Sequence, residues 1–200
     1  MLNTSAVVID NLLVYQFLLI FARIGGTLML VPALAESYVN ERIRIIIALA
    51  LTTIVINLLD SLPNSVPSSV ISMAMSIGSE FIIGVFFGTV AKLLFNIAHI
   101  AGTIISSQSG LSAAMLFDPE YNVQSSPEAS LLSITAIAAL VMSDFHHYII
   151  EGVCASYELL PLGSIAPITD FTHTISHLVS HIFFIAFKLA APALVLGVVF

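Results

Sequence analysis

The sequence predicts an all-α protein built of helical hairpins of the integral membrane type. Hydrophobic residues make up 58% of its 200 residues and charged residues only 8%, and the mean hydropathy is +1.08. A soluble domain carries about 25% charged residues, so this chain lacks the groups that a water-facing surface needs. Its apolar stretches are long and do not alternate strictly with polar residues, which favours helices over strands. We therefore expect lipid or other apolar chains to cover its surface.

Five apolar stretches define the expected helices. They are residues 12–34, 43–59, 70–105, 129–150 and 178–200. A bilayer crossing needs about 20 mostly apolar residues, and the third stretch is much longer than that. It forms either one long helix or a helix that is broken near Gly84, Gly88 or Gly102. Pro192 lies inside the last stretch and predicts a kink there.

The few polar residues exclude some functions and hint at an orientation. The net charge is −7 with only five Lys and Arg residues, which argues against nucleic-acid binding. Cys154 is the single cysteine, so no disulfide forms within the chain. Arg42 and Arg44 lie beside the short turn at 35–41, just after it, and the positive-inside tendency would place that turn in the cytoplasm.

Several charges lie where a lipid-facing helix would not carry them. Arg23 is the midpoint of its stretch, Glu80 and Lys92 lie within the third, and Lys188 lies in the middle of the last. A central Arg, Lys or Asp costs about 2.5–3.5 kcal/mol on insertion scales. These charges, with Asp144 near the end of the fourth stretch, indicate either an ion path or pairing between helices or subunits. The pattern favours pairing, because the charges are scattered singly and not lined along one face.

A long polar block with an apolar centre lies between the third and fourth stretches. Residues 106–128 contain three acids, two prolines and no Lys or Arg, while residues 111–117 are mostly apolar. Loops of this length are uncommon in compact proteins and are either functional or disordered. The apolar centre argues against disorder. We therefore expect this loop to be functional.

The histidines raise the alternative of a membrane metal enzyme, or of a metal or ion transporter. His173, His177 and His181 are spaced four residues apart and form one stripe on a helix, where neighbours can share a metal. No HExxH pattern supports them, and the adjacent His146 and His147 point in different directions. No catalytic triad or phosphate-binding glycine loop is visible either. The sequence therefore predicts no enzyme, no cofactor and no metal site.

Eight short strings follow one another along the chain: FARIGG (21–26), QSGLS (108–112), FDP (117–119), VQS (123–125), DFHH (144–147), SY (156–157), LPLG (160–163) and KLAAP (188–192). Taken together in this order, they resemble the FliR/SctT family, the R-type subunit of the export gate of flagellar and virulence type III secretion systems. The resemblance covers nearly the whole chain, and the block at 108–125 is more flagellar than injectisome-like. Phe145 departs from the family, which usually has Gly there, and Ala113 and Ala114 are smaller than the family's residues.

The resemblance implies a single export-gate helical domain over residues 1–200, in a helical assembly at the flagellar basal body of the bacterial inner membrane. Its implied partners are P-type and Q-type subunits (FliP, FliQ), FlhB-like and FlhA-like export proteins, and the unfolded flagellar proteins that pass outward. The family continues into a Q-type-like hairpin, which we expect to be missing from this chain.

Two sets of residues follow from this resemblance and from the misplaced charges. The family's central loop acts as a channel plug, which by position is residues 110–123. We expect the first set to close the pore, because soft apolar side chains can dewet a constriction: Gly110, Leu111, Met115, Leu116, Phe117, Asp118 and Pro119. We expect the second set to serve assembly and charge pairing: Arg23, Gly25, Gly26, Glu80, Asp144, His146 and His147.

Overall fold

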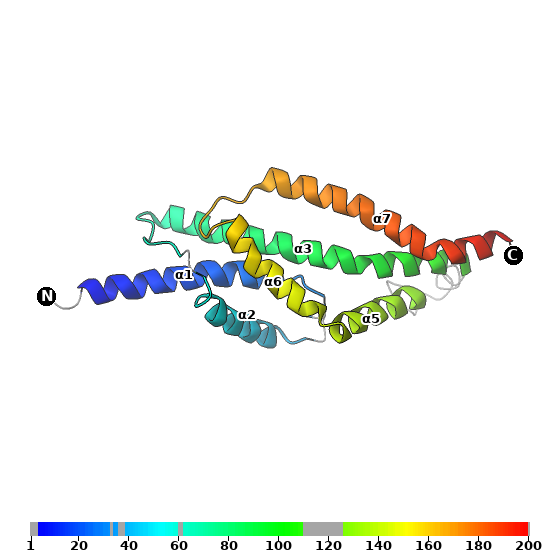
Figure 1. Ribbon diagram of the computed structural model, residues 1–200, viewed down its shortest axis with the longest axis horizontal. Helices are drawn as coiled ribbons and strands as arrows, with labels where there is room; N and C mark the ends of the chain where they lie inside the picture. The colour runs from blue at the N-terminus through cyan, green and yellow to red at the C-terminus, as the bar shows by residue number, and fades with distance from the viewer. Residues whose placement is uncertain (1–3, 33, 36–38, 60–61, 110–125, 200) are drawn as a thin grey trace, which may run out of the picture. The chain divides into compact units, whose positions relative to one another are not determined.

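The computed structural model describes residues 4–32, 34–35, 39–59, 62–109 and 126–199. These residues form helices and contain no strand, which confirms the predicted all-α fold (Figure 1). The helices are α1 (Thr4–Leu28), α2 (Glu41–Val55), α3 (Val70–Ser109), α5 (Pro127–Met142), α6 (Phe145–Leu159) and α7 (Ile168–Val199).

The helix boundaries settle one open alternative and correct two expectations. α3 is one continuous helix of 40 residues, so its glycines do not break it (Figure 1). The fourth apolar stretch is not a single helix: α5 ends at Met142, and Asp144 adopts a left-handed φ of 55° before α6 begins. Aspartate tolerates that conformation better than an apolar residue would, which explains a break that hydropathy does not reveal. α7 begins at Ile168 and not at residue 178.

Short polar residues set the starts of α2 and α5. The Asn40 side chain accepts a hydrogen bond from the backbone N–H of Arg42 at 3.0 Å. The Ser126 hydroxyl accepts one from the N–H of Ala129 at 3.3 Å, and Pro127 follows as the first helical residue. Such side chains satisfy N–H groups that the first turn leaves without helical partners, and proline has no N–H to satisfy there.

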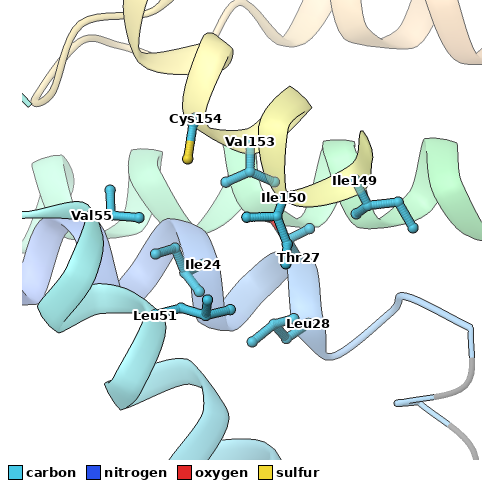
Figure 2. Close-up of a pocket in the computed structure, with 9 residues that line it drawn as sticks. All are labelled: Ile24, Thr27, Leu28, Leu51, Val55, Ile149, Ile150, Val153 and Cys154. Carbon is cyan, nitrogen blue, oxygen red and sulfur yellow. The ribbon is translucent and has the colours of Figure 1, made fainter. Parts of the chain in front are cut away.

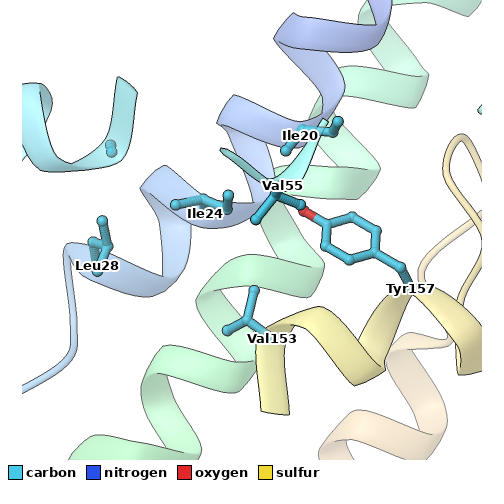
Figure 3. Close-up of a cluster of buried hydrophobic side chains, with 7 residues drawn as sticks. Ile20, Ile24, Leu28, Val55, Val153 and Tyr157 are labelled. Atoms are coloured by element: carbon cyan, nitrogen blue, oxygen red, sulfur yellow. The ribbon is translucent and has the colours of Figure 1, made fainter. Parts of the chain in front are cut away.

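The chain divides into two compact units, and the first contains the buried core that concerns function. This unit comprises residues 1–91 and 147–169, which contain α1, α2, the first part of α3 and most of α6. Its core joins residues of α1, α2 and α6, six of which are labelled in Figure 3: Ile20, Ile24, Leu28, Val55, Val153 and Tyr157. The expectation of a single export-gate domain over residues 1–200 stays a prediction.

The second unit comprises residues 92–146 and 170–200, with the rest of α3, all of α5 and most of α7. α3 and α5 come close at Gly102, where a Cβ would collide with the backbone of Ala129. His99 and Ser133 share a hydrogen bond of 3.2 Å between the same helices. Small residues thus allow two apolar helices to approach at backbone distance, as is common in membrane proteins.

Three described helices are long and apolar enough to cross a membrane. Their candidate spans are Asn11–Leu28, Val70–Gln108 and Ile168–Gly197, with mean hydropathies of 1.4, 2.0 and 1.9. α5 and α6 supply a fourth if their bent pair counts as one span. These lengths and compositions support a membrane location. The kink expected at Pro192 stays a prediction; α7 continues through that residue to Val199.

Candidate functional site

Glycines bring α1 and α3 into direct backbone contact. A Cβ at Gly84 would collide with the carbonyl oxygen of Arg23, and one at Gly88 would lie 2.7 Å from that of Thr27. A Cβ at Gly26 would lie 2.8 Å from the Phe81 carbonyl oxygen. Gly84 and Gly88 are four residues apart, the spacing at which small residues open a helix face to a neighbour. This contact positions the charged residues of both helices.

A buried ion pair crosses this contact. Arg23 Nε donates to Glu80 Oε2 at 2.6 Å, and both side chains are 0% exposed. Neither group reaches water, so each depends on protein partners to replace its hydration. An uncompensated charge at such depth would cost several kcal/mol.

The other two nitrogens of the Arg23 guanidinium bind the end of α6 and the residue that follows it. Its Nη1 donates to the Ser156 hydroxyl at 3.2 Å, and its Nη2 donates to the Leu160 carbonyl at 2.9 Å. The Tyr157 ring covers the guanidinium, with 4.3 Å from Arg23 Cζ to the ring centroid. A cation over an aromatic face is further stabilised when both are desolvated. One side chain of α1 therefore holds α3 and α6 together.

Glu80 and its neighbour Ser79 hold the segment that connects α6 to α7. Glu80 Oε1 accepts a hydrogen bond from the Gly163 N–H at 2.7 Å. The Ser79 hydroxyl donates to the Ser164 carbonyl at 2.6 Å and accepts from the Ala166 N–H at 2.7 Å. Gly163 has φ +81°, a conformation that side chains with a Cβ rarely adopt. We call this connector, residues 160–167, the latch.

Together these contacts link helices and do not form a reaction centre. We call them the staple, which comprises Arg23, Glu80, Ser79, Ser156 and Tyr157. The guanidinium and both carboxylate oxygens have fixed partners inside the fold. A charge pair that is fully hydrogen-bonded in this way is poorly suited to carry protons or ions, because moving either charge would leave the other buried alone. The geometry therefore favours the pairing interpretation of these two charges over the ion-path interpretation.

Two polar atoms in this region are buried without a hydrogen-bond partner among the described residues. They are the hydroxyl of Ser164 in the latch and the hydroxyl of Tyr157. Figure 3 shows it pointing toward Ile20 and Val55, two apolar side chains. Burying such a hydroxyl costs about 1–3 kcal/mol. The tyrosine is therefore held by its ring, which faces Arg23.

A small apolar cavity lies beside the same core. Its volume is about 30 Å³, and its lining residues come from α1, α2 and α6, including Thr27, Val55 and Cys154 (Figure 2). Its volume could hold a water molecule, but its apolar lining offers such a molecule no hydrogen bonds. Cys154 is half-buried at its wall and contributes its thiol as a small hydrophobe.

The structure separates the other residues expected to serve assembly. Gly26 does meet another backbone, whereas Gly25 has open space at its Cβ position. Asp144 is exposed at the break between α5 and α6, His147 is exposed in α6, and His146 lies in the first turn of α6. The seven expected plug residues all fall within 110–119, outside the described residues.

Sequence reasoning missed the polar residues that complete the staple. Ser79, Ser156 and Tyr157 were given no role, although Ser156 and Tyr157 belong to a family string. The close approach of α1 and α3 could have been predicted from the sequence, because Gly84 and Gly88 form a small-x-x-x-small pair. Sequence reasoning treated these glycines as a possible helix break instead.

Comparison with known proteins identifies the family. A model described as "Bacterial export proteins, family 1" matches residues 14–200. The chain belongs to this family. A "Flagellar biosynthetic protein FliR" of Caulobacter vibrioides is 30% identical over 187 residues, which cover 94% of this chain and 74% of that protein. The protein of that name in Bacillus subtilis is 26% identical over 179 residues, covering 88% of this chain and 68% of the relative.

Relatives named for protein translocation match as well. The "Yop proteins translocation protein T" of Yersinia pestis is 31% identical over 129 residues, which cover 62% of this chain and 48% of that protein. The match to both kinds of relative confirms the resemblance to the FliR/SctT family.

Proposed function

We propose that this bacterial export protein is a channel component of the flagellar type III export apparatus in the inner membrane, without enzymatic activity of its own. The observation that carries this proposal is the family match across residues 14–200, joined by similarity to flagellar relatives over 94% of the chain. The candidate spans agree with a membrane location. Unfolded flagellar proteins are its proposed cargo.

Two exposed lysines support assembly with partner subunits. Lys92 and Lys188 lie on α3 and α7, within candidate spans, and form no ion pair among the described residues. Lys188 Nζ lies 4.3 Å from the Phe184 ring centroid on its own helix. A cation on an apolar helix is costly in lipid and calls for a partner. P-type and Q-type subunits (FliP, FliQ), with FlhB-like and FlhA-like proteins, are the partners we propose.

Native purification of the tagged chain from its own membrane tests this assignment. We expect P-type and Q-type subunits to co-purify in fixed ratio. Arg23→Met should reduce their yield because the staple holds α1, α3 and α6 of the first unit together. The exposed substitution Glu158→Met is the matched control. A stable chain that purifies without either subunit would refute the proposal.

Within this function, residues 110–123 are proposed to plug the pore. The hypothesis is that Met115, Leu116 and Phe117 pack together when no substrate is present, while Asp118 and Pro119 turn the loop back. Replacing 110–123 with a Gly/Ser linker of equal length should leave co-purification intact and make the membrane permeable to small solutes. Ion permeability equal to that of the unaltered protein would count against the plug.

The alternative of a metal enzyme or transporter depends on the histidine stripe of α7. The rings of His173 and His177 lie 4.5 Å apart between centroids, and both side chains are exposed. Within the described part of the chain, no three or more His, Cys, Asp or Glu residues are grouped to hold a metal. Metal analysis of the natively purified protein discriminates: stoichiometric zinc or iron would favour the alternative.

A further inference from the structure

An apolar groove lies on the first unit, none of its lining residues belongs to the staple, and the proposed function does not use it. It has a volume of about 430 Å³, within the range of ligand pockets in proteins. We call it the α1–α2 groove. It is lined chiefly by Phe21, Gly25 and Met29 of α1 and the turn after it, Ile45 and Ala48 of α2, and Phe81 of α3.

Gly25 creates the depth of this groove. A Cβ at Gly25 would meet nothing within 4 Å, whereas its neighbour Gly26 is pressed against α3. The space beside Gly25 is therefore not needed for packing among the described residues. From Phe21 to Leu28 the apolar floor runs seven helical residues, about 10 Å, which suits an extended hydrocarbon chain.

The charged groups of the groove lie together at one end. Glu41 and Arg44 belong to the first turn of α2, and both line the groove. Arg44 Nη2 donates to the Val39 carbonyl at 3.3 Å, which anchors it at this end. Arg42 belongs to the same turn but does not line the groove, and basic residues gather where a helix meets the cytoplasmic membrane surface. The groove thus has one charged end and one apolar end, as an amphiphile does.

We propose that the α1–α2 groove binds one phospholipid with a zwitterionic ethanolamine headgroup. Its acyl chain lies along Gly25 and Phe21, its phosphate beside Arg44, and its ammonium beside Glu41. A carboxylate beside a guanidinium matches a headgroup that carries both signs, whereas a purely anionic headgroup would meet repulsion from Glu41. A docking helix from another protein would have no need of opposite charges confined to one end. This inference does not depend on the export function.

Lipid binding to the purified full chain tests the proposal directly. The delipidated protein in detergent is titrated with phosphatidylethanolamine, phosphatidylcholine or phosphatidylglycerol of identical acyl chains, and bound lipid is counted by native mass spectrometry. We expect one phosphatidylethanolamine per chain, bound more tightly than the other two. Its ammonium can donate N–H hydrogen bonds to Glu41, which the quaternary ammonium of phosphatidylcholine cannot, and phosphatidylglycerol has no cation. Equal retention of all three lipids, or of none, would overturn the proposal.

Matched variants locate the site. Gly25→Leu fills the groove with the volume of about four carbon groups of the lipid chain and should weaken phosphatidylethanolamine binding about tenfold or more. Gly78→Leu is the control, because Gly78 is also helical and also has open space at its Cβ position. Glu41→Gln should abolish the preference over phosphatidylglycerol. Circular dichroism and the labelling rate of Cys154 check that all variants fold alike.

One result would reassign the groove to a protein partner. If Gly25→Leu leaves lipid binding unchanged but removes a subunit from the natively purified complex, the lipid proposal is overturned. Conversely, loss of lipid binding in Gly25→Leu with export in cells intact would support the lipid site while leaving the proposed function to its own co-purification test.

Discussion

Removing Arg23, Glu80, or both charges measures how strongly the staple couples its helices. Arg23→Met leaves the Glu80 carboxylate buried without a cation, and Glu80→Met leaves the guanidinium without an anion. Removing one partner of a buried pair costs about 3–5 kcal/mol, so independent effects would add to about 6–10 kcal/mol. In the double variant only neutral groups lose partners, chiefly the Leu160 carbonyl and the Gly163 N–H. At about 1–3 kcal/mol each, these cost roughly 2–6 kcal/mol.

The double variant is therefore expected to lose roughly 4 kcal/mol less stability than the two single variants lose in sum. A charge reversal, Arg23→Glu with Glu80→Arg, is expected to fail where the apolar double succeeds. The groups around the pair have fixed polarity: a carboxylate at position 23 would face the Leu160 carbonyl, and a guanidinium at position 80 would face the Gly163 N–H. Failure of the reversal thus follows from the internal pair and does not argue against it.

The single cysteine provides the assay. Cys154 lies in α6 at the wall of the same core and is half-buried, so its reaction with a fluorogenic thiol reagent reports opening of this unit. Unfolding by increasing SDS in mixed micelles yields a midpoint and a free energy of unfolding for each variant. The control is the exposed substitution Glu158→Met, whose free energy of unfolding should lie within about 0.5 kcal/mol of that of the unaltered protein. A double variant that loses as much stability as the two single variants in sum would refute the coupling of Arg23 and Glu80. A charge reversal that recovers full stability would refute the fixed polarity of their surroundings.

Three further substitutions test the packing around the staple with the same thiol assay. Gly84→Ala should destabilise the protein by about 1–3 kcal/mol or more, because its Cβ collides with the Arg23 backbone. The control Gly78→Ala should be neutral or slightly stabilising, because its Cβ position is open. Equal effects of the two substitutions would contradict the close contact. Gly163→Ala should cost about 1–2 kcal/mol from its positive φ alone, since nothing crowds its Cβ; no loss would mean that the latch adopts another conformation. Tyr157→Phe should leave stability unchanged or raise it by about 1 kcal/mol, because it deletes an unpartnered hydroxyl and keeps the ring over Arg23; a loss above 1 kcal/mol would reveal a partner for that hydroxyl.

Much of the helical layout could be read from hydropathy, and its failures have physical causes. The length of the apolar stretches and their lack of strict alternation located the helices. The turn at Asp144 depends on one backbone conformation, which leaves no trace in apolar content. α7 begins earlier than expected because a histidine-bearing segment, residues 168–177, is too polar to register as an apolar run yet still forms helix. The glycines of α3 are compatible with a continuous helix because the cost of each is about 1 kcal/mol and tertiary contact offsets it.

The sequence by itself determined that this protein is α-helical, is suited to a membrane, and carries charged residues within its apolar helices that need partners. Its short sequence motifs also indicated the export family. Only the tertiary structure decided which partner Arg23 has. Arg23 and Glu80 are 57 residues apart, and the latch groups that complete their hydrogen bonds lie 83 and 137 residues away along the chain. Spacing along a sequence carries no information about such contacts, because they arise only when glycines let α1 and α3 approach closely enough for one guanidinium to reach three segments.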